Sequence, residues 1–352
     1  DDPVDNSGDM NLETVATSGA GAVGVDIQTG GTTATETEST ATAAVTAINT
    51  GGGNDAVTST GNLQGASFAT SGAVAVSFTQ GGETPKSESK AKSTAEATAA
   101  GIMTDGGKAT SLHDFSLTIN DSGIAGSYEQ RSAAAVGDDD VTSSGSISSA
   151  ATATSGTVAA SVTIKGSAKA ETETEAKATA SGIDTGGGID TVDNSATIDA
   201  ISTATAATVA ASVSSEGNAI TNSGFFGGGT KATSSAAGIS TAGSDFEKSL
   251  NVDASIDFEN IGVDVSVTSV NDSLSGDGAD TITNSGNVTT TSNAISPALT
   301  TAATSKGIAA SVGRAKSAST STAIESGGDS DVIDNSGTLI SESTANAVMA
   351  NI

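Results

Sequence analysis

Charged and small residues alternate strictly in the segment AKAETETEAKA at 168–178. Its Lys and Glu residues all occupy odd positions, and its Ala and Thr residues occupy even ones. A period of two places the two sets on opposite faces of a β-strand. In a helix, Glu173 would pair with both Lys169 and Lys177 at i,i+4 spacing. The Thr content favours a strand, so the pattern predicts a strand with one charged face and one face of small residues.

A glycine-rich phrase followed by Asp and an apolar residue recurs along the chain. The apolar markers are separated by 53, 84, 51, 90 and 51 residues. The markers are Val4, Val57, Val141, Val192, Ile282 and Ile333. We interpret TINDSGI (118–124), AITNSGFF (219–226) and FENIGV (258–263) as partial further copies in the long gaps. The chain therefore consists of repeat units of about 51 residues.

Each unit carries further elements in a fixed order. A small apolar strand follows the marker, as in GAVAVSF at 72–78, GTVAASV at 156–162 and, displaced, GIAASV at 307–312. An alternating strand that ends on Ile comes next, as at 86–102. Glycines before the Asp predict a turn with positive φ, and Asn-Ser-Gly predicts a second corner. Asn side chains of successive coils are expected to form a hydrogen-bonded ladder, and residues such as Val192 and Ile198 are expected to stack inward.

These features predict an all-β fold, a parallel β-solenoid (β-helix) that forms a single domain over 1–352. Coils that cannot bury a face alone share a continuous core when they stack. We expect irregular insertions near 105–135 and 225–270. If each unit made two coils, the chain would hold about fourteen coils in a rod about 65 Å long. One or three coils per unit are alternatives that the sequence leaves open.

Composition and charge limit the classes of function that this chain can have. Aromatic residues make up 2% of the chain and Trp is absent, which is a composition often found in disordered chains. There are only 3 Pro residues, however, and a stack of small-residue coils needs no bulky core. The net charge of −28 argues against nucleic acid and anionic membranes as partners. No apolar run is long enough for a membrane span.

The phrases G-x-G-x-D-x-I and D-x-I-x-N-S-G-x-I resemble the repeats of secreted bacterial β-solenoid proteins, namely autotransporter passengers and filamentous-haemagglutinin-like adhesins. This resemblance implies an extracellular or cell-surface location. GDGADTI at 276–282 is also similar to one nonapeptide of the repeats-in-toxin proteins. In those proteins adjacent nonapeptides share calcium ions, whereas here such phrases stand about 51 residues apart.

The acidic turns are the candidate metal site. Calcium prefers carboxylate and carbonyl oxygens. The candidate ligands are Asp55, Asp139, Asp190, Asp280 and Asp331, with the equivalent Asp2 and further oxygens from Asp138, Asp277 and Asp329. The alternative is that these carboxylates cap turns without a metal.

We expect no enzymatic activity. His113 is the only histidine and Cys is absent, which disfavours a Ser/His/Asp triad and zinc catalysis. We place His113 in a loop. A glycosidase would need an aromatic-lined groove in addition to two carboxylates. The Lys/Glu strands at 86–92 and 169–177 form either a solvated face or a contact with a neighbouring chain, and Phe225–Phe226 forms either a local core or an exposed contact.

Both ends of the sequence resemble the repeat, and neither resembles the polar cap that normally closes a solenoid. We therefore expect a self-assembling, head-to-tail subunit of an extracellular filament, fibre or sheath, in which the last coil of one copy stacks on the first coil of the next. The alternative is an adhesin or autotransporter-passenger stalk that binds a cell-surface receptor or glycans. An excised fragment of a longer repeat protein would have similar ends.

Overall fold

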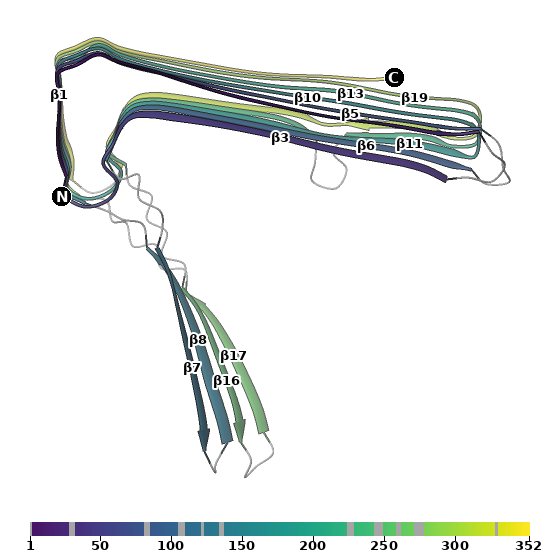
Figure 1. The fold of residues 1–352 in the computed structure, drawn as a ribbon, viewed down its shortest axis with the longest axis horizontal. Helices are drawn as coiled ribbons and strands as arrows, with labels where there is room; N and C mark the ends of the chain where they lie inside the picture. Colours follow the sequence, from purple (N-terminus) through teal and green to yellow (C-terminus); the bar gives the residue numbers. More distant parts are fainter. Residues whose placement is uncertain are drawn as a thin grey trace.

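The computed structural model is a parallel β-solenoid, and its described residues contain strands but no helix. The structure describes residues 2–27, 32–80, 85–104, 110–120, 123–133, 137–223, 229–242, 249–257, 262–270, 278–327 and 330–352. Successive coils lie on top of one another, so that segments far apart in the sequence run side by side (Figure 1). The predicted fold class is confirmed.

Three parallel sheets form the solenoid: sheets B and C face each other, and the short strands of sheet A close one end (Figure 1). Sheet A contains β1 (Pro3–Asn6), β4 (Ala56–Ser59), β9 (Asp140–Ser143), β12 (Thr191–Asn194), β18 (Thr281–Asn284) and β22 (Val332–Asn335). Sheet B contains β2 (Met10–Asp26), β5 (Leu63–Thr79), β10 (Ile147–Lys165), β13 (Ile198–Glu216), β19 (Val288–Lys306) and β23 (Leu339–Asn351). Sheet C contains β3 (Thr32–Asn49), β6 (Lys86–Met103), β11 (Ser167–Asp184), β14 (Ala219–Ser223), β15 (Thr230–Ser240), β20 (Ala309–Gly313) and β21 (Ala315–Glu325).

One repeat unit makes one coil. All six marker residues pair in a single row through sheet A, from Val4 to Ile333. The rod of about fourteen coils that two coils per unit would give is therefore wrong. The reason is strand length: an unbroken alternation makes β5 17 residues long and β6 18 residues long, so two long strands consume most of a unit. The six strands of sheet A extend about 24 Å along the axis.

Branched apolar side chains fill the corner where the three sheets meet. One buried cluster contains Val57, Leu63, Ile102, Val141, Ile147, Ile183, Val192, Ile198, Ile239, Ile282 and Val288, with Ile48 at its edge. Val192 and Ile198 are fully buried and stack on their equivalents in the neighbouring coils, as predicted. This corner supplies the bulky core that the rest of the coil lacks.

Ala and hydroxyl side chains fill the space between sheets B and C. A second cluster consists of Ala residues from both sheets, such as Ala153 and Ala178. Beside it, a chain of hydrogen bonds zigzags between the sheets through Ser18, Ser39, Ser71, Ser93 and Ser155, with each Oγ–Oγ distance 2.8–2.9 Å. Buried hydroxyls are satisfied there, and small side chains let the two sheets approach closely.

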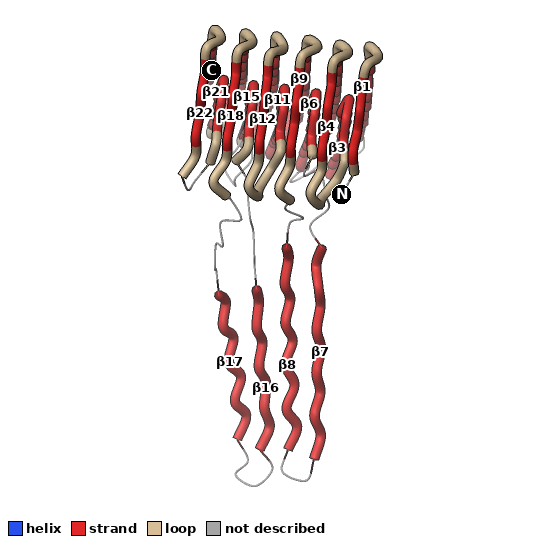
Figure 2. Tube along the Cα trace, turned by 90° about the vertical axis from the view of Figure 1, so that its left-hand side faces the viewer, coloured by secondary structure: helices blue, strands red, loops and turns tan. Residues whose placement is uncertain are grey.

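Two antiparallel hairpins project from the solenoid (Figures 1 and 2). The first is β7 (Thr110–Asn120) with β8 (Gly123–Ala133), and the second is β16 (Ser249–Asp257) with β17 (Gly262–Val270). β8 pairs with β16, which joins the hairpins into a four-stranded sheet. In chain order, each hairpin lies between a strand of sheet C and the next strand of sheet A. The two hairpins fall within the gaps of 84 and 90 residues between marker residues.

The hairpins correct several readings of the sequence. TINDSGI includes the end of β7 and the start of β8, FENIGV ends in β17, and AITNSGFF begins in β14, so none is a partial extra coil. GIAASV belongs to β20, which pairs with β14 in sheet C rather than joining sheet B. His113 lies in β7 opposite Gln130, not in a loop. These short phrases share composition with the repeat but not its position in a coil. Thr230–Ser240, within the expected insertion near 225–270, is solenoid strand β15.

Candidate functional site

The predicted site residues form a ladder along the corner between sheets C and A. The backbone N–H of each Asp donates to Oδ1 of the equivalent Asp in the next coil, at N–O distances of 2.8–3.0 Å. The ladder runs through Asp2, Asp55, Asp139, Asp190, Asp280 and Asp331. The solenoid therefore stacks residues that are as much as 90 positions apart in the sequence. Glycines with positive φ precede the ladder, including Gly53 and Gly188, as the turn prediction requires.

Hydroxyl groups hold the second carboxylate oxygen in two coils. Thr185 donates to Oδ2 of Asp190 at 2.6 Å, and Thr104 donates to Oδ2 of Asp139 at 2.5 Å. Burial raises the pKa of Asp190 to about 7, against the opposing effect of the Thr185 hydrogen bond. Burial likewise raises the pKa of Asp139. Burial in the middle of the ladder thus favours the neutral form of both carboxyl groups relative to exposed Asp side chains.

The ladder geometry fits turn capping better than calcium binding. In the described part of the chain, no three His, Cys, Asp or Glu side chains gather so as to hold a metal ion. The Oδ1 atoms accept backbone N–H groups, and calcium would require 6–8 oxygen ligands directed at one point. Asp138 accepts the N–H of Ile189 from the next coil at 3.0 Å, and Asp277 and Asp329 lie outside the described residues. Calcium at these turns stays a prediction, without support from the geometry.

The raised pKa of Asp190 predicts that the solenoid becomes less stable as pH rises. The folded state favours the neutral carboxyl, so this contribution is fully present below about pH 4 and is lost as pH rises through about 7. We expect the free energy of unfolding to fall by about 1–2 kcal/mol between pH 5 and pH 8, after allowance for solvent screening. Thermal unfolding followed by circular dichroism across this range measures the slope.

Two variants isolate the Asp190 contribution. Asp190→Asn keeps an oxygen for the Asp139 N–H and should flatten the pH profile. Asp193→Asn removes the same charge from an exposed position of β12 and should leave the slope intact. Equal slopes in the parent and in Asp190→Asn would show that Asp190 does not titrate in this range.

A second ladder, formed by Asn side chains, occupies the Asn-Ser-Gly corner. Asn194 Nδ2 donates to Asn284 Oδ1 at 2.7 Å, and Asn284 Nδ2 donates to Asn335 Oδ1 at 2.6 Å. The predicted Asn ladder is therefore confirmed in these three coils. Ser59 and Ser143 take the equivalent positions in two earlier coils, where Ser59 accepts from Asn6 at 3.2 Å.

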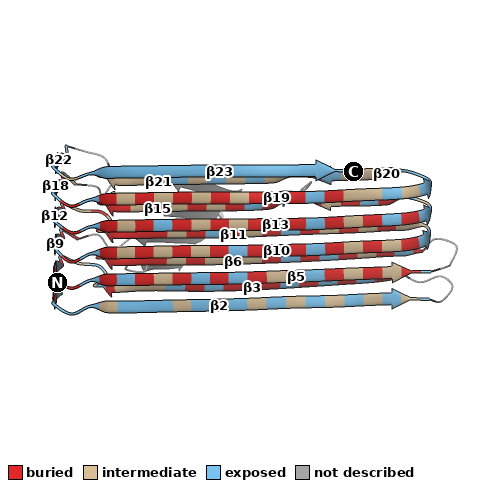
Figure 3. Cartoon of the chain, turned by 90° about the horizontal axis from the view of Figure 1, so that it is seen from above, coloured by how far each residue is buried: buried red, intermediate tan, exposed pale blue. Residues whose placement is uncertain are grey.

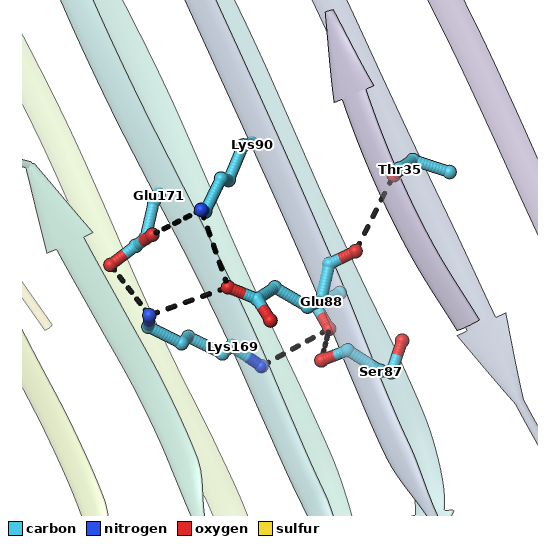
Figure 4. Close-up of polar contacts among 7 residues, drawn as sticks. Thr35, Ser87, Glu88, Lys90, Lys169 and Glu171 are labelled. Carbon is cyan, nitrogen blue, oxygen red and sulfur yellow. Dashed lines mark hydrogen bonds and ion pairs between the residues drawn. The ribbon is translucent and has the colours of Figure 1, made fainter. Parts of the chain in front are cut away.

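Charged side chains cover the outer face of sheet C. In Figure 4, Glu88 and Lys90 of β6 meet Lys169 and Glu171 of β11 in a ring of alternating charge. The N–O distances around the ring are 2.8 Å, 3.4 Å and twice 3.9 Å. Burial acts to lower the pKa of Lys169, but Glu171 and Glu88 raise it overall. The predicted alternation is confirmed, and its charged face forms ion pairs between neighbouring coils.

A cavity of about 250 Å³ lies farther along sheet C. It is lined by Glu173, Thr174, Glu175, Gly229, Thr230, Lys231, Arg314 and Lys316. Lys231 Nζ lies 2.7 Å from Glu175 Oε1, so its charge is already balanced. The lining has no His or Cys, and we assign no reaction to it. Phe225–Phe226 lies outside the described residues.

The edges of the two outer coils form the remaining candidate site. β2 and β23 are the outermost strands of sheet B in the described part of the chain, and Figure 3 shows β23 exposed along its length. Inward-pointing Ile333 and Leu339 are 48% and 41% exposed. Val4 and Met10 occupy the same two rows at the opposite end. The sequence did not identify these edges by residue, because exposure depends on which strand lies outermost.

The fold and its ladders define a parallel β-solenoid built on small residues. Comparisons of the chain with family models, curated protein sequences and solved structures found no match to any of them. Among the described residues, no helix has the length and apolar character needed to cross a membrane.

Proposed function

We propose that this chain is an extracellular structural protein, a subunit that stacks head to tail into a surface filament, fibre or sheath. One observation carries the proposal: in the described part of the chain, no strand covers either end of the two apolar rows that run through all six coils. If a second copy stacked in register, its Val4 would cover Ile333 and its Met10 would cover Leu339. Such a heterologous contact repeats without closing unless its rotation forms a ring.

Backbone hydrogen bonds would supply much of the stacking energy. Ile352 N–H donates to Thr300 and Ile352 C=O accepts from Ala302, so even-numbered residues of β23 face β19. In a parallel strand the odd-numbered residues then point their N–H and C=O groups to the open edge. An open edge of this length is a template for another strand. The inward side chain of Ala345 on β23 would continue the interior row of Ala153, Ala204 and Ala294.

A stalk that carries a binding element is the second candidate, and the hairpins favour it. Their four-stranded sheet extends away from the solenoid (Figure 2), where it could contact a receptor or glycan on another cell. The resemblance to autotransporter passengers and filamentous-haemagglutinin-like adhesins supports the same reading. A stalk needs further coils of its own chain at the open edges, whereas a filament needs a second copy.

Electron microscopy of two matched variants tests the filament. Ala345→Lys places a charge at an inward position that is exposed in one copy and buried after stacking. Val332→Lys adds the same charge to the same coil, but on the outer face of sheet A. We expect long fibres from the parent and from Val332→Lys, and short rods from Ala345→Lys.

Short rods from the parent under all conditions would exclude the filament and favour the stalk. Parent samples with calcium and with chelator give a separate result. Fibres only with calcium would show that a metal takes part in the joint, and fibres in both would show that it is not needed.

A further inference from the structure

The outer face of sheet B is nearly free of charge. The outward-facing residues of the six strands of sheet B include only three charged side chains, Glu13, Asp199 and Glu342, and all three lie near the start of their strands. The chain as a whole has a net charge of −28, and the outer face of sheet C carries the Lys/Glu ladder. The two faces of one flat molecule therefore differ strongly in the number of charged side chains that they expose.

Apolar side chains gather toward one end of this neutral face. Val74, Val158, Val209 and Leu299 form one row through four neighbouring coils. Each is 39–43% exposed. A monomeric protein rarely exposes a contiguous apolar surface of this kind without a partner.

The neutral face is large and open. Its strands have 13 to 19 residues, and a 17-residue strand is about 56 Å long. Six strands extend about 24 Å across, which gives on the order of 1,300 Å². A standard protein interface buries about 800 Å² on each partner. Both hairpins leave on the sheet C side (Figure 1), and the strands of sheet B run nearly parallel with little twist (Figure 3). A flat face of small side chains is suited to close sheet-to-sheet packing.

We propose that two copies of this chain pair laterally, with the outer faces of their B sheets in contact. The neutral face is where two such acidic chains can meet with few like charges in contact, because its three carboxylates lie away from the row of Val74, Val158, Val209 and Leu299. A twofold pair uses the same patch on both copies and leaves both C faces in water. This contact does not depend on head-to-tail stacking, because it uses a face of the solenoid rather than its open edges.

Analytical ultracentrifugation of the Ala345→Lys background tests the pair, since that variant is designed to block end stacking. We expect a dimer for Ala345→Lys and a monomer after Val209→Lys is added. Adding Thr179→Lys, on the outer face of β11, should leave the dimer intact. Higher salt should increase the dimer fraction, because it screens the repulsion between the two acidic chains.

Cysteine cross-linking gives a second readout. The chain has no Cys, so Val209→Cys introduces a single thiol. A short bismaleimide should join two copies of Val209→Cys but not two copies of Thr179→Cys. A background variant that stays monomeric at all salt concentrations, with no cross-link through position 209, would overturn lateral pairing. Binding of that monomer to phosphatidylcholine vesicles, abolished by Val209→Lys, would overturn it in favour of a lipid surface.

The lateral and end-to-end proposals fail separately. Parent rods that pair sideways but never lengthen would remove the filament and retain the pair. Long fibres of single solenoid width would retain the filament and remove the pair.

Discussion

Gly182→Ala is expected to destabilise the solenoid by about 3 kcal/mol, the upper part of the range for overpacking a core. A Cβ on Gly182 would lie 2.3 Å from Cγ2 of Ile198 and 2.5 Å from the carbonyl oxygen of Gly238 in the neighbouring coil. Both contacts are far inside van der Waals distance. Because one of them is with backbone, a change of rotamer cannot relieve the clash.

The chain contains its own comparison for this position. The row through Gly182 consists of Ala47, Gly101, Gly182, Gly238 and Ala323. Its glycines meet the γ-carbons of Ile147, Ile198 and Val288, which are β-branched. Each glycine meets the residue of sheet B in the coil that follows it. For Ala47 and Ala323, the residues at that position of sheet B are Leu63 and Leu339, which have no branch at Cβ. Glycine therefore occurs in the coils where a branched neighbour needs the space.

Urea denaturation of four proteins checks this account. Gly182→Ala should lower the unfolding midpoint, and Gly182→Ala with Ile198→Leu should recover part of the loss. Gly156→Ala serves as the control, because it faces Ala207 in the next coil and a Cβ there would come no nearer than 4.0 Å to that residue's carbonyl oxygen. It should be neutral or slightly stabilising. An unchanged midpoint for Gly182→Ala would refute the steric explanation.

Asn284→Ala is expected to cost about 3 kcal/mol as well, since it breaks a buried ladder in the middle of its run. The Asn284 side chain is fully buried and accepts from Asn194. It also donates to Asn335 and to the Gly286 carbonyl. Removing it opens a cavity and takes away a partner from each neighbour.

Asn335→Ala is the matched control, because the same side chain lies exposed at the open edge. Water can replace its partners there, so we expect a loss below about 1 kcal/mol. Hydrogen exchange should show faster exchange at the corners next to Asn284 in the first variant only. Equal losses from the two variants would show that burial of the ladder contributes little.

The secondary structure and the repeat were readable from the sequence because both are periodic. Alternation at 168–178 fixed the strand and its two faces, and β11 has that pattern of burial. The marker spacing identified residues that pair in one row from Val4 to Ile333. The position of a short segment was predicted wrongly where only its composition matched the repeat. TINDSGI and GIAASV resemble repeat segments, but they lie in a hairpin and in sheet C.

The candidate site was predictable in part. The Asp and Asn positions were identified, and both form ladders along the axis. The partners of the Asp residues were not predictable, because Thr104 and Thr185 reach the carboxylates only once sheet C ends beside sheet A. The direction of the Asp190 pKa shift likewise depends on burial, which no local pattern of residues specifies.

The sequence by itself determined strands, turns, a unit of about 51 residues and an acidic, small-residue surface, since each of these follows from periodicity or composition. Only the tertiary structure decided that each unit makes one coil, that Ser and Thr hydroxyls join sheets B and C, and that the neutral face lies opposite the charged one. These features depend on which strands face each other and where each coil bends. Such choices are made by packing between residues that are 20 to 90 positions apart.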